Sequence, residues 1–433
     1  MNPVLYLVYR LLQGMAILGN EVYFRKIHYI NKQYLSADGP LVVICNHPNT
    51  VVDPLLAIMY AREPVFLLAN YSLFKNPIAG AILRTLFCIP VKRVKDVAER
   101  ENRDNDDAFR KSEQHLKEKR SIFLAAEGSS YTERHIRTFK TGAARILFAA
   151  ESQSDFKLNV RILPVGLTYF DPLKFGSDVV VEVGAPFSAA DWKDRYAQNP
   201  QETVNNFMQY IEDKFHDLTI HCENVKEDHF LQKLEAVIQS EKPLDTEGVY
   251  FRSKKILMSI QEWKKSDATG FKVFEQQVET YFSRLKTLKL KDVKTEKFSV
   301  SKSLGLCIVG FPAFIIGLIP NFIPAWIANG LVRWLKLDSA YDTTVRLIFG
   351  FFLIFPMLYW IETELFCAFL FPNLTNISFF QTILLIVFYI TSGLLAWRVY
   401  TEGGRFLNFQ KYKRANSDGS LTAMRQPILD VLN

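Results

Sequence analysis

A histidine and an aspartate lie close together just after the first strongly apolar run of this sequence. Residues 45–54 read CNHPNTVVDP, so His47 and Asp53 follow the run at residues 40–45. A histidine can take a proton from a hydroxyl group while a carboxylate fixes its tautomer and stabilises the imidazolium ion. The pair is therefore a candidate general base with its orienting acid. The alternatives are a helix N-cap for Asp53, which precedes Pro54, and an ordinary loop position for His47.

Further blocks of charged or small residues follow other apolar runs. They read IPVKR, EGSS, FKTGAARI and ILPVG at residues 89–93, 127–130, 139–146 and 162–166. Arg93 and Lys140 carry positive charge, and an arginine can donate two parallel hydrogen bonds to a phosphate group. A solvated surface position is the alternative for Lys140, Arg134 and Arg137. For Glu127 the alternative is a structural carboxylate that bonds backbone amides at a strand end.

In this order and at these intervals, the blocks resemble the motifs of the glycerolipid acyltransferase family, which includes glycerol-3-phosphate and lysophosphatidic acid acyltransferases. The resemblance covers roughly residues 35–190. It implies that His47 deprotonates the acceptor hydroxyl, which attacks an acyl thioester, and that Asp53 positions His47. It also implies a set of substrate-binding residues, namely Arg93, Glu127, Gly128, Ser129, Ser130, Lys140 and Pro164.

Two features depart from the family's commonest pattern. Five residues (48–52) separate His47 from Asp53 where four are usual, which we interpret as the mark of a subfamily. Ser130 stands where many lysophosphatidic acid acyltransferases carry arginine. The charge that binds the acceptor phosphate then comes from Arg93, Lys140, Arg134 or Arg137, and the acceptor's identity stays open.

The pattern around these blocks predicts the elements that must position them. Strand-like runs occur at residues 40–45, 64–68, 89–91, 121–125, 160–169 and 178–183, with helical stretches such as 54–62 and 141–151 between them. This alternation predicts an α/β fold, an acyltransferase-type layered domain with a mostly buried sheet. Residues 200–300 are rich in Glu, Lys and Gln with apolar residues at helical spacing, which predicts a helical insert.

The remaining segments have the character of membrane elements. Residues 303–332 and 365–397 contain no charged side chain, and a bilayer core needs only about 20 apolar residues. Basic residues flank this region on both sides, which predicts cytoplasmic flanks and an even number of crossings, two or four. Residues 3–18 are apolar around Arg10, which is typical of an interfacial helix, with a buried core helix as the alternative.

These patterns divide the chain into five predicted parts. They are a membrane-interfacial N-terminal helix at 1–34, an acyltransferase domain at 35–195, a helical region at 196–300, a C-terminal transmembrane helical region at 301–400 and a cytoplasmic basic tail at 401–433.

The composition excludes several classes of protein. Of the 433 residues 49% are apolar, which excludes disordered and low-complexity chains. The five cysteines are isolated, which argues against a disulfide framework or a structural zinc site. A phosphate-binding loop, a dinucleotide fingerprint and a serine nucleophile elbow are not found. The net charge of +7 suits an anionic lipid surface better than a nucleic acid. We therefore expect no cofactor, no metal and no nucleic-acid partner.

The resemblance and the membrane pattern together predict an integral membrane enzyme with its catalytic domain on the cytoplasmic face. The expected reaction moves a fatty acyl group from acyl-CoA or acyl-carrier protein to the hydroxyl of lysophosphatidic acid in phospholipid biosynthesis. Glycerol-3-phosphate or dihydroxyacetone phosphate is the alternative acceptor. A different alternative is a non-catalytic, membrane-anchored scaffold that binds lipid. A transporter is disfavoured, because the crossings are few and the apolar blocks at 303–332 and 376–397 carry no charge.

Overall fold

The computed structural model describes residues 2–85, 87–92, 105–294, 298–370 and 379–432. The chain divides into two compact units. Unit 1 comprises Met1–Glu223 with Asp338–Thr344, and unit 2 comprises Asn224–Leu337 with Val345–Asn433. We call the short segment Asp338–Thr344, which belongs to unit 1 although it lies far along the chain, the connector.

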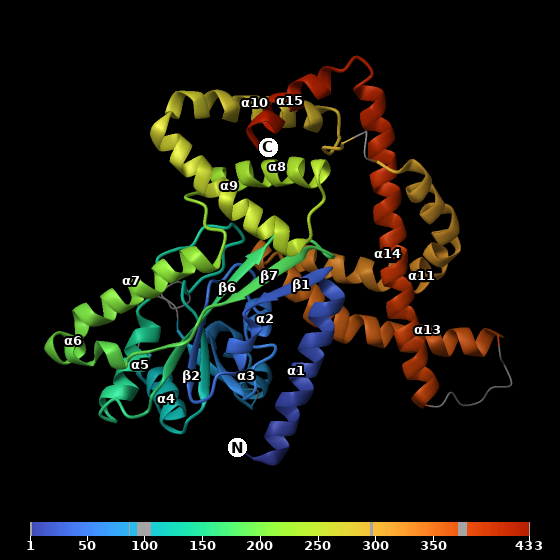
Figure 1. The fold of residues 1–433 in the computed structure, drawn as a ribbon. Helices are drawn as coiled ribbons and strands as arrows, with labels where there is room; N and C mark the ends of the chain where they lie inside the picture. The colour runs from blue at the N-terminus through green and yellow to red at the C-terminus, as the bar shows by residue number, and fades with distance from the viewer. Residues whose placement is uncertain (1, 86, 93–104, 295–297, 371–378, 433) are drawn as a thin grey trace. The chain divides into compact units, whose positions relative to one another are not determined.

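Unit 1 is built on an eight-stranded sheet in the order β1-β7-β6-β2-β5-β3-β4, with β8 paired to β6 (Figure 1). The strands are β1 (Lys26–Ile30), β2 (Leu41–Cys45), β3 (Val65–Asn70), β4 (Cys88–Val91), β5 (Ser121–Ala125), β6 (Arg161–Tyr169), β7 (Asp178–Val183) and β8 (Phe187–Ser188). Strands β6, β2, β5, β3 and β4 run parallel to one another, whereas β7 is antiparallel to β6. The α/β prediction is confirmed.

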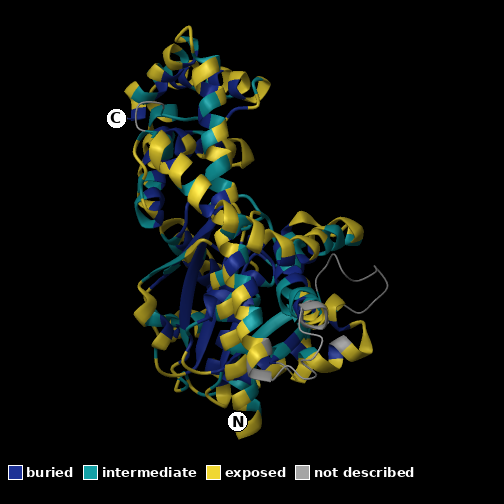
Figure 2. Ribbon diagram, turned by 90° about the vertical axis from the view of Figure 1, so that its right-hand side faces the viewer, coloured by how far each residue is buried: buried dark blue, intermediate teal, exposed yellow. Residues whose placement is uncertain are grey.

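Helices cover both faces of this sheet. Those of unit 1 are α1 (Pro3–Tyr23), α2 (Val52–Ala57), α3 (Pro77–Thr85), α4 (Asp106–Lys117), α5 (Gly142–Ser152), α6 (Lys193–Gln198) and α7 (Pro200–Leu218). Side chains of α5 and α7 pack with β2, β5 and β6 in one apolar core, while α2 lies against the same strands from the other side. The central strands β2, β5, β6 and β7 are accordingly almost entirely buried, and buried parts of the ribbon are dark blue in Figure 2. Every residue of β2 is buried, which explains its uninterrupted apolar sequence.

The register of the central strands gathers their carboxyl ends at one edge. Cys45, the last residue of β2, pairs with Ala125 at the end of β5 and with Val165 of β6. The segments that follow β2 and β5 therefore start side by side. This edge is where the His47 and Glu127 blocks of the sequence come together.

The ends of the predicted acyltransferase domain differ from what the sequence suggested. Residues 1–34 were expected to be an interfacial helix, but α1 ends at Tyr23, β1 joins the sheet beside β7, and a 3-10 helix, Lys32–Ser36, follows. Helix α7, expected in the helical region at 196–300, packs on the sheet of unit 1. One side of α1 is buried and the other exposes Val4, Leu7, Leu11, Met15 and Leu18. Its membrane role stays a prediction.

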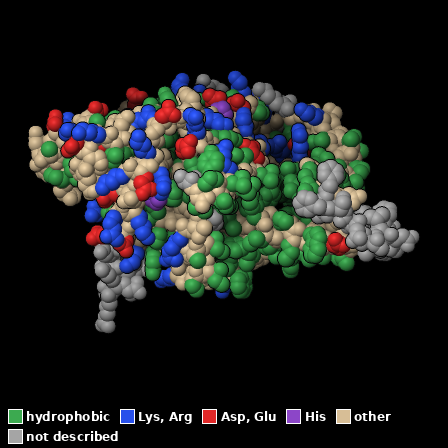
Figure 3. Space-filling model, turned by 90° about the horizontal axis from the view of Figure 1, so that it is seen from below, with side chains coloured by type: hydrophobic (Ala, Val, Ile, Leu, Met, Phe, Trp, Pro, Cys, Tyr) green, Lys and Arg blue, Asp and Glu red, His purple; other side chains and the backbone are tan. Residues whose placement is uncertain are grey.

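Unit 2 contains the helical region and the apolar helices. Its helices are α8 (Val225–Glu241), α9 (Thr246–Ser266), α10 (Ala268–Thr287), α11 (Val300–Leu335), the π-helix Arg346–Ile354, α13 (Phe355–Leu370), α14 (Phe379–Ala415) and α15 (Ser420–Leu432). Among the described residues, three helical stretches are long and apolar enough to cross a membrane, namely Val300–Leu335, Ser339–Leu365 and Ile383–Ala415. Hydrophobic side chains gather on the face seen in Figure 3.

The apolar helices α11 and α14 meet through small residues. A Cβ atom on Gly317 would lie 2.1 Å from the carbonyl oxygen of Ser392, so only glycine allows this approach. One turn further along, the side-chain amide of Asn321 donates to the carbonyl oxygens of Gly317 and Tyr389 and accepts from the hydroxyl of Tyr359. A polar side chain thus links α11, α13 and α14.

Residues 401–433 were predicted as a basic tail, but residues 401–432 are helical and packed, apart from the turn at residues 416–419. They form the end of α14 and helix α15, whose Leu421, Ile428 and Arg425 are buried. The guanidinium group of Arg425 is paired with Asp292 at 3.0 Å and with Glu241 at 2.9 Å. The charge of Arg425 therefore serves the packing of unit 2.

Candidate active site

The structure places His47 and Asp53 in direct contact. Nδ1 of His47 lies 2.9 Å from Oδ2 of Asp53, and both side chains are buried. The five residues between them turn back, because α2 starts at Val52 and brings Asp53 round to the histidine ring. Asp53 lies inside the first turn of α2 and does not cap it, since the N-cap is Val51. The alternative interpretation of Asp53 as an N-cap is therefore wrong.

The carboxylate of Asp53 accepts two further hydrogen bonds. The backbone N–H of Asn49 donates to Oδ2 at 2.7 Å, and the hydroxyl of Tyr169 donates to Oδ1 at 2.7 Å. Burial raises the pKa of Asp53 above its ordinary value, and the bond from His47 opposes that rise. Three donors around one buried carboxylate fix its orientation and compensate for its lost hydration. No described residue bonds to Nε2 of His47 among the hydrogen bonds found.

Glu127 is held against the same loop. Its Oε1 accepts from the backbone N–H of His47 at 2.9 Å, and its Oε2 accepts from the backbone N–H of Arg137 at 3.2 Å. Burial raises the pKa of Glu127 to about 7, and the negative charge of Asp53 adds to the rise. Glu127 therefore bonds backbone amides, as the structural alternative required, and does so beside the histidine.

The small residues after Glu127 form a loop over Lys140. Gly128 has a φ of +71°, a left-handed conformation that favours glycine. A Cβ atom at Gly128 would lie 3.4 Å from Cγ of Lys140, whose backbone N–H bonds the carbonyl of Ala126. Ser129 and Ser130 are half-buried in this loop, and the side chain of Lys140 is exposed. These four predicted residues lie together near Glu127.

Pro164 lies within the sheet, opposite Ile44 of β2. Proline is tolerated there because β6 changes partner from β8 to β7 at this point, so that no ladder N–H is needed. The carbonyl of Pro164 accepts from Gly184 N–H at 2.8 Å. Pro164 thus helps to hold β6 in the sheet. Three residues further along β6, the backbone of Leu167 bonds the side chain of Asn46, which precedes His47.

Part of this chain is similar in sequence to known acyltransferases. Residues 26–168 match the family model described as Acyltransferase. This segment contains β1 to β5 and nearly all of β6, together with His47, Asp53 and Glu127. Residues 26–168 are an acyltransferase domain. Together with the two relatives described next, this match confirms the resemblance of the sequence motifs to the glycerolipid acyltransferase family.

Two curated relatives come from Saccharomyces cerevisiae. Glycerol-3-phosphate O-acyltransferase 2 is 25% identical over 233 residues, covering 51% of this chain and 31% of the relative. Glycerol-3-phosphate O-acyltransferase 1 is 23% identical over 257 residues, covering 54% and 32%. The chain thus spans about a third of the length of these relatives. Among solved structures, the 1-acyl-sn-glycerophosphate acyltransferase PlsC from Thermotoga maritima matches with a TM-score of 0.33 and 16% identity, covering 47% of this chain and 80% of PlsC.

The basic residues expected to bind phosphate are only partly described. Arg93 lies outside the described residues; the preceding residue, Lys92, follows β4 directly. Arg134 is buried, and its carbonyl accepts from Cys222 N–H. The guanidinium group of Arg137 lies 4.3 Å from the ring of Tyr131 and 3.8 Å from Glu133. Within the described part of the acyltransferase domain, Lys140 is therefore the most accessible cation of the predicted set.

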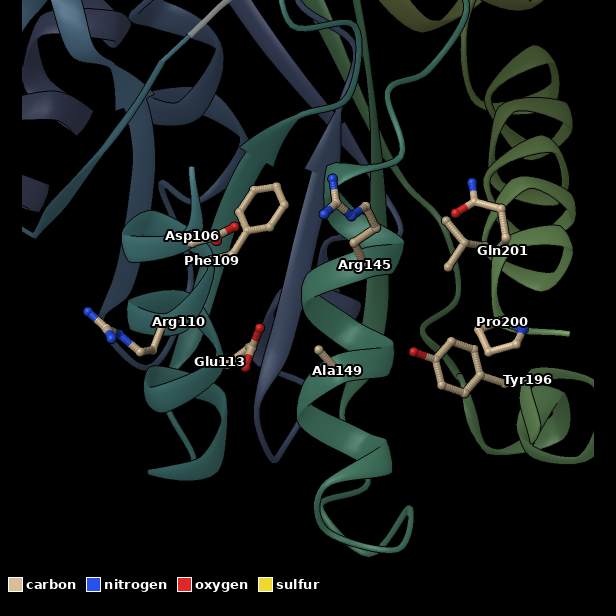
Figure 4. Close-up of a pocket in the computed structure, with 10 residues that line it drawn as sticks. Asp106, Phe109, Arg110, Glu113, Arg145, Ala149, Tyr196, Pro200 and Gln201 are labelled. Carbon is tan, nitrogen blue, oxygen red and sulfur yellow. The ribbon is translucent and has the colours of Figure 1, made fainter. Parts of the chain in front are cut away.

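The cavities in the described part of the acyltransferase domain and its flanking helices include a small one and a larger one. The smaller, about 10 Å³, is bordered by Asn46, Pro48, Glu127 and Tyr169 and has room for a single water molecule. The larger, about 340 Å³, opens between α4, α5 and α7, with Arg145, Glu113 and Tyr196 around it (Figure 4). None of the predicted site residues that the structure describes borders the larger cavity.

Several residues of the site were missed from the sequence. Asn46 exchanges two hydrogen bonds with the backbone of Leu167, at 2.8 and 2.7 Å, and so fastens the His47 loop to β6. Asn49 and Tyr169 bond Asp53 as described above. Tyr169 is the last residue of a predicted strand. A prediction that β6 lies beside β2 would have placed Tyr169 near Asp53. No group of His, Cys, Asp or Glu suited to a metal ion occurs in the described ranges, and metal-free catalysis stays a prediction.

Proposed function

We propose that this chain is a membrane-bound O-acyltransferase that moves a fatty acyl group from a thioester to a hydroxyl of a glycerol phosphate acceptor. The contact between Nδ1 of His47 and Oδ2 of Asp53 carries the proposal. It lies at the carboxyl edge of the central strands, inside a segment that matches the acyltransferase model. An imidazole held through Nδ1 presents Nε2 to a substrate, which is the arrangement a general base requires.

The reaction then takes two steps. His47 Nε2 removes the proton from the acceptor hydroxyl as its oxygen attacks the thioester carbonyl carbon, which gives a tetrahedral intermediate. The carbon–sulfur bond breaks as the carbonyl re-forms, and the departing thiolate takes the proton back from the imidazolium. Asp53 orients the ring and stabilises its positive charge between the steps, as the acid of a catalytic triad does.

The next question is which glycerol phosphate acceptor receives the acyl group. The sequence slightly favoured lysophosphatidic acid, which stays a prediction. The two yeast relatives are named as glycerol-3-phosphate O-acyltransferases, and the chain departs from the arginine pattern at Ser130. We therefore propose glycerol-3-phosphate as the first acceptor to test. Lysophosphatidic acid is the second, because the apolar helices suit an enzyme whose acceptor is itself a lipid.

The bilayer is the proposed source of the acyl substrate. Each methylene group buried from water contributes about 0.8 kcal/mol, so a long acyl chain partitions into the membrane. The three apolar helices would hold the enzyme there. By the positive-inside rule we propose that the acyltransferase domain faces the cytoplasm, with acyl-CoA or acyl-carrier protein as donor.

The test is acyl transfer by the detergent-purified full chain. Labelled palmitoyl-CoA is offered with glycerol-3-phosphate and, in parallel, with lysophosphatidic acid; acyl-carrier protein is then tested as donor. We expect product from one acceptor with wild type, and loss of that product in His47→Ala. His229→Ala, an exposed histidine of α8, is the matched control and should retain full activity. Equal product from wild type and His47→Ala would overturn the role of His47, whereas no product with any donor would favour the scaffold.

A further inference from the structure

The connector is a polar segment between apolar helices, yet it packs on the acyltransferase domain. It follows α11 in the chain, and the next candidate membrane helix begins within it, at Ser339. Asp338 caps its short 3-10 helix by accepting from the backbone N–H of Ala340 at 3.0 Å. Ala340, Thr343 and Thr344 are all buried, with Thr343 fully so. Two threonines buried in unit 1 need partners there, since an unpaired buried hydroxyl is unfavourable.

The first partner is Thr50, in the loop between His47 and Asp53. The Thr50 hydroxyl donates to the carbonyl of Ala340 at 3.1 Å and lies 2.7 Å from the hydroxyl of Thr344. Because a hydroxyl carries a single proton, Thr344 must be the donor in the second bond. Thr50 has a φ of +40°, which a β-branched residue rarely adopts. Such a conformation persists only where its surroundings hold it, and both bonds that hold the Thr50 side chain come from the connector.

The second partner is the carbonyl of Pro172. This oxygen accepts from the Thr343 hydroxyl at 2.6 Å and from the side-chain amide of Asn49 at 3.0 Å. The hydroxyl of Tyr23, from α1, lies 3.3 Å from that of Thr343. The connector thus supports Asn49 through a shared acceptor and Thr50 by direct contact.

Both supported residues, Asn49 and Thr50, lie in the loop between His47 and Asp53, and this loop carries hydrogen bonds to Asp53. The backbone N–H of Asn49 donates to the same Asp53 oxygen that contacts His47. A shift of Asn49 or Thr50 therefore moves a donor of Asp53, and with it the ring of His47. The extra residue between His47 and Asp53 lengthens the loop that needs this support.

We propose that the connector is a positioning element for the His47–Asp53 pair, acting through Thr344 on Thr50 and through Thr343 on Pro172; this rests on the proposed function of His47. The segment that joins two apolar helices then has a second task, which is to hold the loop of the general base. It touches no reacting atom and acts only through Asn49 and Thr50.

The test removes one hydroxyl without changing side-chain shape. Thr344→Val and Thr50→Val both delete the bond between the two threonines in the full-length, detergent-purified enzyme, and Thr50→Val also deletes the bond to the Ala340 carbonyl. We expect kcat to fall about 3- to 10-fold in Thr344→Val, the equivalent of one neutral hydrogen bond, and about 10- to 100-fold in Thr50→Val, with KM for both substrates within about twofold of wild type. The double variant should be no slower than Thr50→Val, because the bond that Thr344→Val removes is already lost there. Thr344→Ser, which keeps the hydroxyl, should restore kcat.

Controls separate positioning from folding. Thr203→Val deletes a hydroxyl that is equally buried in α7, far along the chain from the loop, and should leave kcat unchanged. Hydrogen exchange of residues 46–53 gives a readout that does not depend on activity, and we expect faster exchange in Thr344→Val. Unchanged kcat and exchange in Thr344→Val, or losses that simply multiply in the double variant, would overturn the proposal. Wild-type activity that survives in His47→Ala would instead overturn the proposed function beneath it.

Discussion

The carboxylate of Glu127 accepts a hydrogen bond from the backbone N–H of His47 at 2.9 Å, so the block at residues 127–130 holds the block around His47 in place. The two residues follow neighbouring parallel strands, β5 and β2, and are 80 positions apart in the sequence. Glu127 thereby contributes to the site by fixing the main chain of the histidine. A role of this kind does not require the carboxylate to touch the acceptor.

Glu127 should make the stability of the protein fall as pH rises. Its pKa is raised from 4.5 to about 7 in the folded chain, so between these values the folded state binds more protons than the unfolded state. Raising the pH from 5 to 8 should therefore lower the free energy of unfolding, by up to about 3 kcal/mol from this group. Glu127→Gln lacks the titration. In thermal unfolding at several pH values, the melting temperature of wild type should drop relative to the variant as pH rises. A difference that is constant with pH would contradict the assignment.

Asp53→Asn should remove the negative charge of this side chain while keeping its shape. If the amide oxygen takes the place of Oδ2, it still accepts from His47 and Asn49, and the amide nitrogen faces the Tyr169 hydroxyl, which can accept. The fold should survive, while the negative charge that stabilises the imidazolium is lost. We expect kcat to fall about 100- to 10,000-fold, with a small change in KM. Steady-state kinetics measure this, and a loss below tenfold would show that Asp53 is not the partner of the base.

Tyr169→Phe should weaken the support of Asp53 without removing it. The variant loses one hydrogen bond to a buried carboxylate, a bond that contributes about 1.5–3 kcal/mol. We expect a melting temperature lower by several degrees and a kcat about tenfold lower. Loss of a donor also raises the pKa of Asp53 further, so the acid limb of the rate profile should move to higher pH. Tyr210→Phe, at a partly exposed tyrosine of α7, is the control, and a profile identical to wild type would speak against the prediction.

Gly317→Val should separate α11 from α14. The added Cβ would lie 2.1 Å from the Ser392 carbonyl oxygen, which backbone cannot accommodate. Gly330, in the same helix, has nothing within 4 Å of a Cβ position and provides the control. We expect Gly317→Val to lower the melting temperature in detergent and Gly330→Ala to keep or raise it, by the helix propensity of about 1 kcal/mol. Equal stability of the two variants would exclude close packing at Gly317.

Much of unit 1 could be predicted because its signals are local. The strand-like run at 121–125 coincides with β5, and the run at 178–183 coincides with β7. Continuous apolar runs mark strands buried on both faces, which explains their clarity. Strand β1 was missed because its sequence, KIHYI, is short, carries Lys and His, and remains partly exposed.

The contact between His47 and Asp53 was predictable for the same reason, and the residues that hold the pair were not. His47 and Asp53 are six positions apart, whereas Tyr169 reaches Asp53 from 116 positions away. Such contacts follow from strand order, which the sequence pattern does not contain. Nothing in the residues around Thr344 distinguishes it from any other threonine next to an apolar run. Its partner becomes visible only when the connector is placed on the sheet domain.

The bond between Thr50 and Thr344 also has a consequence for the order of biosynthesis. The two residues are 294 positions apart, and a ribosome adds about 5–20 residues per second, so roughly 15 to 60 s pass between them. Once residue 188 has been added, the nascent chain carries all eight described strands and both His47 and Asp53, but the loop between them lacks its later support. If the connector positions the pair as proposed, full activity must wait until translation has passed α11. A chain that terminates before the connector would then hold His47 and Asp53 without the segment that keeps them in register.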